Sequence, residues 1–324
     1  MNWLVGDAPS LKSVALGVHS LDHFALSVPD LEKARDFYSA FGLEVLPHGN
    51  ILSLHTSAHP QQQWGLILEG SAKRLHHLSF GIFEDDLPHF KLRLEQHHVP
   101  LLDPPRGLET TGLWFKDPDG VLIELRIAPK TSPDRKVAAD WISSPDGKAG
   151  APKRSEAPLV KPVRLGHCLT FTRDVPAAIA FYGDILGLRL SDRAGSDIAF
   201  MHGIHGSAHH LIAFARSEAP GLHHCCWDVR SLNEIGLGAM QMAAQGYTQG
   251  WGLGRHVLGS NYFHYVRDPY GSYSEYSCDM DYIPAMSEWR AGDHAAEDAF
   301  YVWGPRPPAD WTHNHEADGQ GRAS

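Results

Sequence analysis

The sequence predicts an α+β fold of tandem βαβββ units, in which two duplicated domains each form a curved, partly open sheet around a cavity. The first observation is a repeat, since segment 21–45 aligns with 165–190. Each copy reads as a short strand, a helix start marked by Asp or Pro, an amphipathic helix containing Phe-Tyr, and a Gly-Leu turn into another strand. The second observation is that one strand, one helix and further strands recur four times, over 21–70, 75–127, 165–217 and 222–280.

Later landmarks keep the same order in both copies. The run HHLSFGI at 76–82 matches HHCCWDV at 223–229, and WFKDPDGVLIEL at 114–125 matches YVRDPYGSYSEY at 265–276. Asp-Pro-x-Gly in the last pair is turn chemistry, because Pro sets the first turn angle and Gly tolerates a positive φ. The copies therefore indicate duplication of a unit of domain length. The second helix of each copy is expected at 86–96 and 231–245.

The repeat divides the chain into four parts. We expect an N-terminal structural domain over 1–127, a linker over 128–162, a C-terminal domain over 163–282 and a tail over 283–324. The linker is rich in Pro, Lys, Ser and Asp without apolar periodicity, which is typical of a surface segment. In the tail, the aromatic stretch 300–305 is expected to pack on the second domain, and the last dozen residues are expected to be mobile.

The composition is that of an ordinary globular protein, with 43% hydrophobic and 20% charged residues. A net charge of −10 without basic runs argues against a nucleic-acid partner. No apolar stretch approaches the roughly 18 residues that span a bilayer, so no membrane partner is expected. The start of the chain lacks the basic and apolar regions of a secretory signal. The four cysteines lack C-x-x-C spacing, which predicts free thiols in a reducing cytoplasm.

Three landmark positions of the second copy carry side chains that can bind a metal: His167 on its first strand, His224 on a middle strand and Glu275 on the last. Two imidazoles and one carboxylate on one face of a metal leave the other face open, which suits Fe(II) or Mn(II). A closed zinc site would instead need four ligands. Each residue also has an ordinary interpretation, as a hydrogen-bonded histidine or a glutamate on a polar strand face.

The first copy has the same three residue types at the equivalent positions, namely His23, His77 and Glu124. The copies differ in the residues expected around each set. The second copy has His210, His256 and Tyr265, whereas the first has Gln63, Pro105 and Trp114, none of which transfers a proton near neutral pH. We therefore interpret the first half as structural and expect the metal only in the C-terminal half.

The run GRHVLGSNYFHYVRDPYGSYSE at 254–275 resembles the signature of the type I extradiol ring-cleavage dioxygenases of the vicinal oxygen chelate superfamily. One position departs from that signature, because His264 stands where the family has an apolar residue before the tyrosine. Strand alternation points His264 away from Tyr265, so we expect it to face solvent, or else a substrate pocket or an interface. The resemblance covers about 20–280. The matching positions are Gly254, His256, Tyr265, Asp268, Pro269, Gly271 and Glu275.

By this resemblance the metal ligands are His167, His224 and Glu275, with Fe(II) the commoner metal and Mn(II) a minority choice. Members of the family bind a catechol through both hydroxyls, activate O₂ at an adjacent site and cleave the ring outside the diol. The resemblance thus implies a catecholic small molecule and O₂ as partners. We also expect a homo-oligomer located in the cytoplasm.

The residue types at the other matching positions suit this chemistry. A catechol hydroxyl needs a base and an acceptor beside it, which His256 and Tyr265 can supply together. Negative charge that develops on O₂ needs a stabiliser and later a proton donor, which suits His210. Cys225 and Cys226 follow a ligand position and are interpreted as small core residues.

Two other functions of the same superfamily stay open, because fold does not fix function. A glyoxalase-like lyase or isomerase would use a fourth protein ligand, and a non-catalytic small-molecule-binding protein would need no metal. The presence of His210, His256 and Tyr265 argues against both.

The substrate is the least determined part of the sequence interpretation. Pocket residues are expected on the loops 201–209 and 246–255 and on the tail. Only Arg255 or Arg290 could clamp a carboxylate there, so a carboxylated catechol is not favoured. The surroundings of Trp251, Tyr262 and Trp303 suit an aromatic or alkyl substituent.

Overall fold

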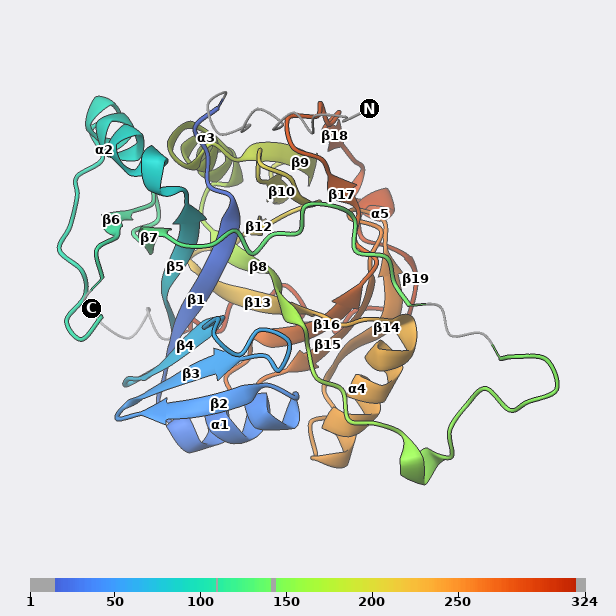
Figure 1. Ribbon diagram of the computed structural model, residues 1–324. Helices are drawn as coiled ribbons and strands as arrows, with labels where there is room; N and C mark the ends of the chain where they lie inside the picture. The colour runs from blue at the N-terminus through green and yellow to red at the C-terminus, as the bar shows by residue number, and fades with distance from the viewer. Residues whose placement is uncertain (1–14, 109, 141–143, 319–324) are drawn as a thin grey trace, which may run out of the picture.

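The computed structural model describes residues 15–108, 110–140 and 144–318, and it confirms the α+β fold (Figure 1). The predicted helix starts are also observed, because the side chains of Asp30, Asp174 and Ser231 each accept a hydrogen bond from a backbone N–H in the first turn. The start of the chain, where no secretory signal is expected, lies outside the described residues.

The N-terminal module, residues 20–127, forms one seven-stranded sheet in the order β2-β3-β4-β1-β5-β7-β6. Two helices accompany it, and a short 3₁₀ turn (Glu84–Asp86) precedes the second. Its elements are β1 (Ser20–Val28), α1 (Leu31–Ala40), β2 (Glu44–His48), β3 (Ile51–His55), β4 (Gly65–Glu69), β5 (Arg74–Ile82), α2 (Leu87–Gln96), β6 (Leu113–Lys116) and β7 (Leu122–Ile127).

The C-terminal module, residues 164–303, forms a ten-stranded sheet in the order β18-β9-β10-β12-β8-β13-β16-β15-β14-β19, and β11 pairs with β17. Its elements as far as the last helix of the repeat are β8 (Arg164–Thr172), α3 (Val175–Leu186), β9 (Arg189–Ala194), β10 (Ile198–His202), β11 (Ser207–Ala208), β12 (Ile212–Arg216), β13 (Gly221–Asp228) and α4 (Leu232–Ala244). The remaining elements are β14 (Gly250–His256), β15 (Tyr262–Arg267), β16 (Tyr273–Cys278), β17 (Tyr282–Ile283), β18 (Gly292–Asp293), α5 (Ala296–Ala299) and β19 (Tyr301–Trp303).

One of the four expected βαβββ units is short of a strand. After α2, only β6 and β7 form, and the position of the missing strand is reduced to a single bridge between Leu102 and Trp114. The reason lies in Pro104 and Pro105, because two consecutive prolines supply no backbone N–H for a strand ladder.

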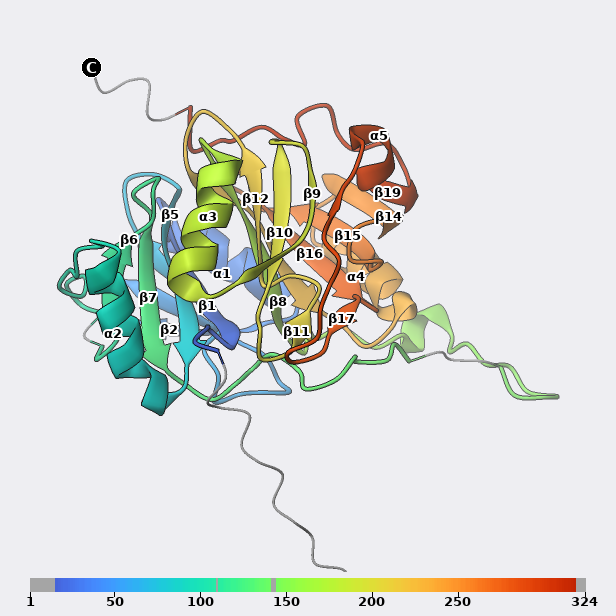
Figure 2. The same ribbon diagram turned by 90° about the horizontal axis from the view of Figure 1, so that it is seen from above.

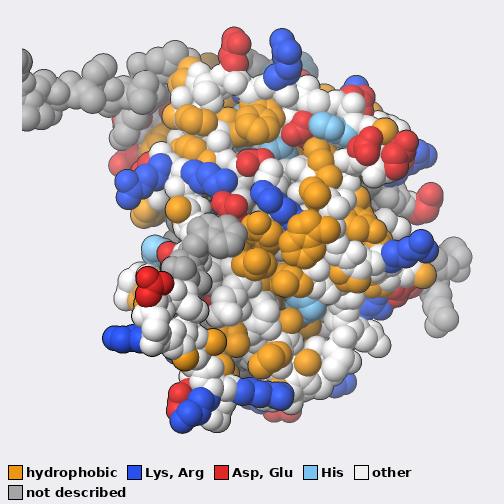
Figure 3. Space-filling model, turned by 90° about the vertical axis from the view of Figure 1, so that its right-hand side faces the viewer, with side chains coloured by type: hydrophobic (Ala, Val, Ile, Leu, Met, Phe, Trp, Pro, Cys, Tyr) orange, Lys and Arg blue, Asp and Glu red, His pale blue; other side chains and the backbone are white. Residues whose placement is uncertain are grey.

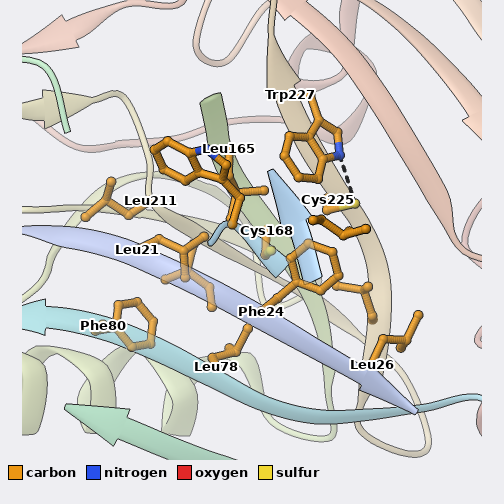
Figure 4. Packing of buried hydrophobic residues seen from close by; sticks show 14 of the residues in the cluster. Leu21, Phe24, Leu26, Leu78, Phe80, Leu165, Cys168, Leu211, Cys225 and Trp227 are labelled. Carbon is orange, nitrogen blue, oxygen red and sulfur yellow. Dashed lines mark hydrogen bonds between the residues drawn. The ribbon is translucent and has the colours of Figure 1, made fainter. Parts of the chain in front are cut away.

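Strand alternation gives each central strand two different faces. On β8 and β13, His167 and His224 point into the curved sheet, while their neighbours Cys168 and Cys225 point to the other module. Figure 4 shows these two cysteines packed with Phe24 and Trp227, whose rings meet edge to face 6.3 Å apart. All four cysteines are free and buried, as expected. The shared core therefore lies between the modules and fixes both sheets back to back.

The segment between the modules runs along their outside, as Figures 1 and 2 show, with one short 3₁₀ turn at Arg154–Glu156. The tail returns to the molecule. Its strand β19 pairs with β14, so the aromatic stretch does lie on the C-terminal module. The expectation of a mobile end is wrong for Glu316, which is 5% exposed and accepts hydrogen bonds from the backbone N–H groups of Leu75 and Leu222. Residues 319–324 lie outside the described part.

Candidate metal centre

Three central strands of the ten-stranded sheet bring together His167 on β8, His224 on β13 and Glu275 on β16. Strand β13 lies between the other two, and its Cys226 is paired with His167 on one side and with Glu275 on the other. The two Nε2 atoms are 3.2 Å apart, and each is 3.5 Å from Oε2 of Glu275. All three residues are buried. Side chains 108 residues apart in sequence thus meet at one point, as the sequence predicted.

The tautomer of His224 is set by a chain of hydrogen bonds behind it. His223 donates from Nε2 to the carbonyl oxygen of Trp311 at 2.8 Å. Burial lowers the pKa of His223 to about 4, so its imidazole is neutral and Nδ1 can only accept. The Nδ1–H of His224, 2.7 Å away, is the donor to that atom. Nε2 of His224 therefore presents a lone pair to His167 and Glu275.

One carboxylate oxygen of Glu275 accepts a hydrogen bond, and the other has no hydrogen-bond partner. Asn261 donates from Nδ2 to Oε1 at 3.1 Å, and its second bond, to Ser277, fixes the amide. Oε2 is buried without a hydrogen-bond partner. A lone pair of His224 and a bare carboxylate oxygen facing each other in a buried site are unfavourable unless a cation lies between them.

The observed spacing fits such a cation. Metal–nitrogen bonds of about 2.1 Å that meet at a right angle put two ligand nitrogens about 3 Å apart, close to the 3.2 Å between His167 and His224. Two imidazoles and one carboxylate on one side of an ion form the facial set that leaves positions open. Among the described residues, the His, Cys, Asp and Glu side chains whose possible ligand atoms come together at this point are His167, His224 and Glu275.

His256 and Tyr265 form a hydrogen-bonded pair on the wall beside the ligands. His256 donates from Nδ1 to the carbonyl oxygen of Phe300 at 2.8 Å, and its Nε2 is 2.9 Å from the hydroxyl of Tyr265. Burial lowers the pKa of His256, so Nε2 is an acceptor for the tyrosine proton. Burial, and then the charge of Glu275, raise the pKa of Tyr265 well above its usual value. The pair is therefore neutral and ready to accept one proton through the tyrosine oxygen.

His210 lies on the other side of the ligands, with its ring 4.0 Å from that of His167. Its Nδ1 is 3.0 Å from Nδ1 of His209, which donates from Nε2 to Asp192 at 2.8 Å. If His209 is neutral, it accepts from His210, and Nε2 of His210 is an acceptor. If His209 carries a second proton, it donates to His210, and Nε2 of His210 becomes a donor to the pocket. Asp192 and His209 thus control the direction of hydrogen bonding at His210.

One pocket of about 620 Å³ is lined by His167 and His224 together with His210, His256 and Tyr265. Its apolar wall includes Ile198, Phe200, Leu258, Phe300 and Trp311. Arg and Lys are absent from the described residues that line it.

The sequence interpretation of the substrate wall was right about the tail, which contributes Ala299, Phe300, Trp311 and Thr312, but wrong about the other segments. Trp251 lies behind Tyr265, with the rings stacked 5.6 Å apart, and does not reach the pocket. Arg255 lies over the ring of Tyr262 and donates to the carbonyl of Ser260. Neither the loop 201–209 nor 246–255 contributes a lining residue. Trp303 is partly exposed at the edge strand instead.

The expectation that His264 faces solvent was also wrong. Strand alternation does turn it away from Tyr265, but α4 packs over β15 and β16 on that side. His264 is therefore half-buried, its Nδ1 has no hydrogen-bond partner, and burial lowers its pKa to about 4. It lies opposite Gly252, which has a positive φ and no side chain to clash with the imidazole. It does not line the catalytic pocket.

The N-terminal module repeats the ligand geometry. His23, His77 and Glu124 also lie with their ligand atoms within 4.8 Å of one another and are buried. Of the replacements expected around them, Gln63 and Trp114 line the adjoining pocket, whereas Pro105 does not.

Several residues that complete the C-terminal site were not identified from the sequence. The adjacent pairs His209–His210 and His223–His224 were a visible signal, since each places a second imidazole beside a functional one. Trp311 and Phe300 act through backbone carbonyls, which no residue type can reveal. Asn261, inside the signature run, could have been noticed as an amide beside a carboxylate.

No helix in the described part of the chain is long and apolar enough to cross a membrane.

Comparison with protein families finds one matching model, the Glyoxalase/Bleomycin resistance protein/Dioxygenase superfamily, over residues 20–125 and 164–276. Among curated proteins, "Metapyrocatechase 2" of Cupriavidus necator is 51% identical over 300 residues, which cover 93% of this chain and 93% of that protein. The two matched segments lie within the two modules of the structure.

Solved structures share the fold. The Mn(II)-bound glyoxalase from Novosphingobium aromaticivorans has a TM-score of 0.74 at 22% identity, over 91% of this chain and 94% of that one. Homoprotocatechuate 2,3-dioxygenase from Brevibacterium fuscum, in complex with 3,4-dihydroxyphenylacetate, has a TM-score of 0.74 at 19% identity, over 93% of each chain.

Proposed function

Since the chain belongs to the Glyoxalase/Bleomycin resistance protein/Dioxygenase superfamily, we propose that it is an extradiol dioxygenase that opens the ring of a catechol with O₂. The ring bond beside one hydroxyl-bearing carbon is cleaved, and both oxygen atoms enter the product, so that no atom is lost. The observation that carries this proposal is the meeting of His167, His224 and Glu275 beside a pocket that His210, His256 and Tyr265 line.

The metal in this proposal is Fe(II), with Mn(II) as the alternative, and it is held by His167, His224 and Glu275. The bare Oε2 of Glu275 and the lone pair of His224 support this assignment. When bound, the ion supplies a Lewis acid that makes the catechol hydroxyls more acidic and a redox centre shared by the ring and O₂. Asn261 keeps the carboxylate oriented through its bond to Oε1.

His256 and Tyr265 would take the proton of one catechol hydroxyl. Tyr265 accepts it on its phenolic oxygen while its own proton passes along the 2.9 Å hydrogen bond to Nε2 of His256. The Nδ1–H of His256 remains bonded to the carbonyl of Phe300, which stabilises the imidazolium that results. Both residues stay in contact, so the proton can return when the product enol rearranges.

His210 would act on the O₂ side of the pocket. Supplied with a proton through His209, its Nε2–H can donate to negative charge that develops on oxygen and then deliver the proton during ring opening. Asp192 keeps His209 oriented toward His210, because its Oδ2 accepts from Nε2 of His209 at 2.8 Å.

The substrate class follows from the pocket wall. Apolar side chains and the absence of Arg or Lys among its described lining residues favour an uncharged catechol that carries an apolar substituent. A panel of catechol, alkylcatechols, biphenyl diols and homoprotocatechuate tests this directly. We expect the carboxylated compound to show the lowest kcat/KM, and a preference for it would refute the substrate proposal.

Oxygen uptake tests the reaction itself. Protein reconstituted with Fe(II) under argon and then mixed with catechols in air should consume one O₂ per ring and form a yellow product. The glyoxalase-like alternative predicts hemithioacetal turnover without oxygen uptake, and the binding-protein alternative predicts neither. If no catechol caused oxygen uptake, the dioxygenase proposal would be rejected.

We also propose that the protein self-associates. The ten-stranded sheet ends at β19, an edge strand on which Val302 is 63% and Trp303 is 43% exposed. Figure 3 shows apolar side chains gathered on this face of the molecule. Light scattering should give a mass that is a multiple of the chain mass, and Val302→Lys should reduce it. A monomer at all concentrations would reject this proposal.

A further inference from the structure

The N-terminal module contains a second set of ligand atoms that the ring-cleavage proposal does not use. Nε2 of His23, on β1, is 3.1 Å from Nε2 of His77, on β5, and Glu124 on β7 completes the group. The three residues are at most 2% exposed. The nitrogen–nitrogen distance is again close to the roughly 3 Å that a metal with bonds of about 2.1 Å at a right angle would impose.

A carboxylate behind His23 sets its orientation. Asp22 accepts from Nδ1 of His23 at 2.7 Å and is itself buried, with Gln62 donating to its other oxygen. A histidine that donates from one nitrogen to a carboxylate presents the other nitrogen to a metal, and this arrangement is common behind metal-binding histidines. In the neutral ring, Nε2 of His23 therefore carries a lone pair that faces His77.

Glu124 has one satisfied and one unsatisfied oxygen. Ser79 donates to Oε2 at 2.6 Å, whereas Oε1 is buried without a hydrogen-bond partner. A hydrogen bond between the two Nε2 atoms would satisfy the two histidines without a metal, but it would leave Oε1 of Glu124 bare. A bare buried carboxylate oxygen is unfavourable, because no hydrogen bond replaces the water that it loses on burial. A cation among the three residues removes this penalty.

The site has room and access for an ion. The three residues line a pocket of about 800 Å³ that opens to solvent. At Gly112, an added Cβ would lie 2.9 Å from Oε1 of Glu124, so the glycine leaves the carboxylate free of a neighbouring side chain.

We propose that His23, His77 and Glu124 form a second binding site for a divalent transition-metal ion in the N-terminal module. This inference goes beyond the ring-cleavage proposal and does not rest on it. It also revises the sequence expectation that the metal lies only in the C-terminal half. That expectation relied on the missing proton-transfer residues, which limit turnover but do not limit binding. With Gln63 and Trp114 in their places, the ion would be bound without ring cleavage.

Metal stoichiometry tests the proposal. The full-length protein is reconstituted under argon with excess Fe(II), or separately Mn(II), desalted, and its metal content per chain is measured by mass spectrometry. We expect two ions in the wild type, one in Glu124→Gln and one in Glu275→Gln. Glu69→Gln is the matched control, since Glu69 is an exposed glutamate of the same module, and it should keep two.

Electron paramagnetic resonance of Mn(II) examines the N-terminal site alone. In Glu275→Gln, one equivalent of Mn(II) should give a protein-bound signal, and adding Glu124→Gln or His77→Gln to that variant should leave the spectrum of free Mn(II). The N-terminal site is unaltered in Glu275→Gln itself, so the Mn(II) signal of this variant does not depend on whether Glu124→Gln folds.

Two results would overturn the proposal. One ion in the wild type and none in Glu275→Gln would mean that the N-terminal set binds no metal, and it would leave the ring-cleavage proposal intact. Two ions in both wild type and Glu124→Gln would place the extra ion elsewhere. The exposed group of His313, His315 and Asp318 would then be examined with His313→Gln.

Discussion

Replacing His223 with Phe tests the hydrogen-bond chain that prepares His224 for a metal. His223 joins the carbonyl of Trp311 to the Nδ1–H of His224, at 2.8 and 2.7 Å. Phe would fit the space, because His223 packs among the rings of Phe171, Tyr273 and Trp311. What is lost is the acceptor that holds the proton of His224 on Nδ1 and away from the ligand atom Nε2.

The expected magnitude follows from the groups left behind. His224 would keep a buried N–H with no partner, which costs about 1–3 kcal/mol, or move its proton to Nε2, where it blocks coordination. Either outcome weakens Fe(II) binding by roughly 10–100-fold, the usual effect of losing the hydrogen-bond partner of a metal-binding histidine. Catechol turnover at saturating Fe(II) should change much less.

The assay is anaerobic competition with a coloured Fe(II) chelator, run beside catechol turnover as iron is added. His223→Gln should recover part of the affinity, because its amide oxygen can accept from His224. His89→Gln is the control, since His89 is an exposed residue of α2 and lies away from the pocket. If His223→Phe held Fe(II) as tightly as the wild type, the tautomer assignment at His224 would be refuted.

Three further variants probe proton transfer and stability. His210→Phe should keep its iron and bind catechol but lose roughly 10²–10⁴-fold in turnover, and loss of iron would show that the ligand set is misassigned. Asp192→Asn should leave the iron content unchanged and reduce turnover less than His210→Phe does, because Asp192 acts on His210 only through His209. Unaltered turnover in Asp192→Asn would exclude this role of the Asp192–His209 pair. Burial raises the pKa of Asp117 to about 6. Because the folded state then binds the proton more tightly than the unfolded state, stability is lost as pH rises through that value. Urea unfolding of the wild type should therefore lose about 2 kcal/mol from this group between about pH 4.5 and about pH 7.5, and Asp117→Asn should flatten this dependence.

The arrangement of the strands that carry His167, His224 and Glu275 could be predicted from the sequence. The duplicated landmarks fixed which strands correspond, and the alternation of a strand placed His167 and His224 on one face with their cysteine neighbours on the other. The turn Asp268–Gly271 was recognisable because Gly271 has the positive φ that the turn requires.

Other parts of the site depend on contacts that no local pattern contains. Asp192 on β9 meets His209, which follows β11, and Trp311 reaches His223 from a tail with no counterpart in the repeat. The position of His264 was misjudged because alternation gives the face of a strand but not what covers that face. The missing strand after α2 was predictable in principle, since Pro104 and Pro105 were visible in the sequence.

The central claim is that the three C-terminal ligands hold the iron on which ring opening depends. The most direct measurement is iron content and catechol-dependent O₂ uptake of Glu275→Gln beside wild type and Glu69→Gln, all reconstituted with Fe(II) under argon. We expect wild type and Glu69→Gln to consume one O₂ per catechol, and Glu275→Gln to lose one iron and all measurable uptake. Oxygen uptake by Glu275→Gln at the wild-type rate would contradict the claim.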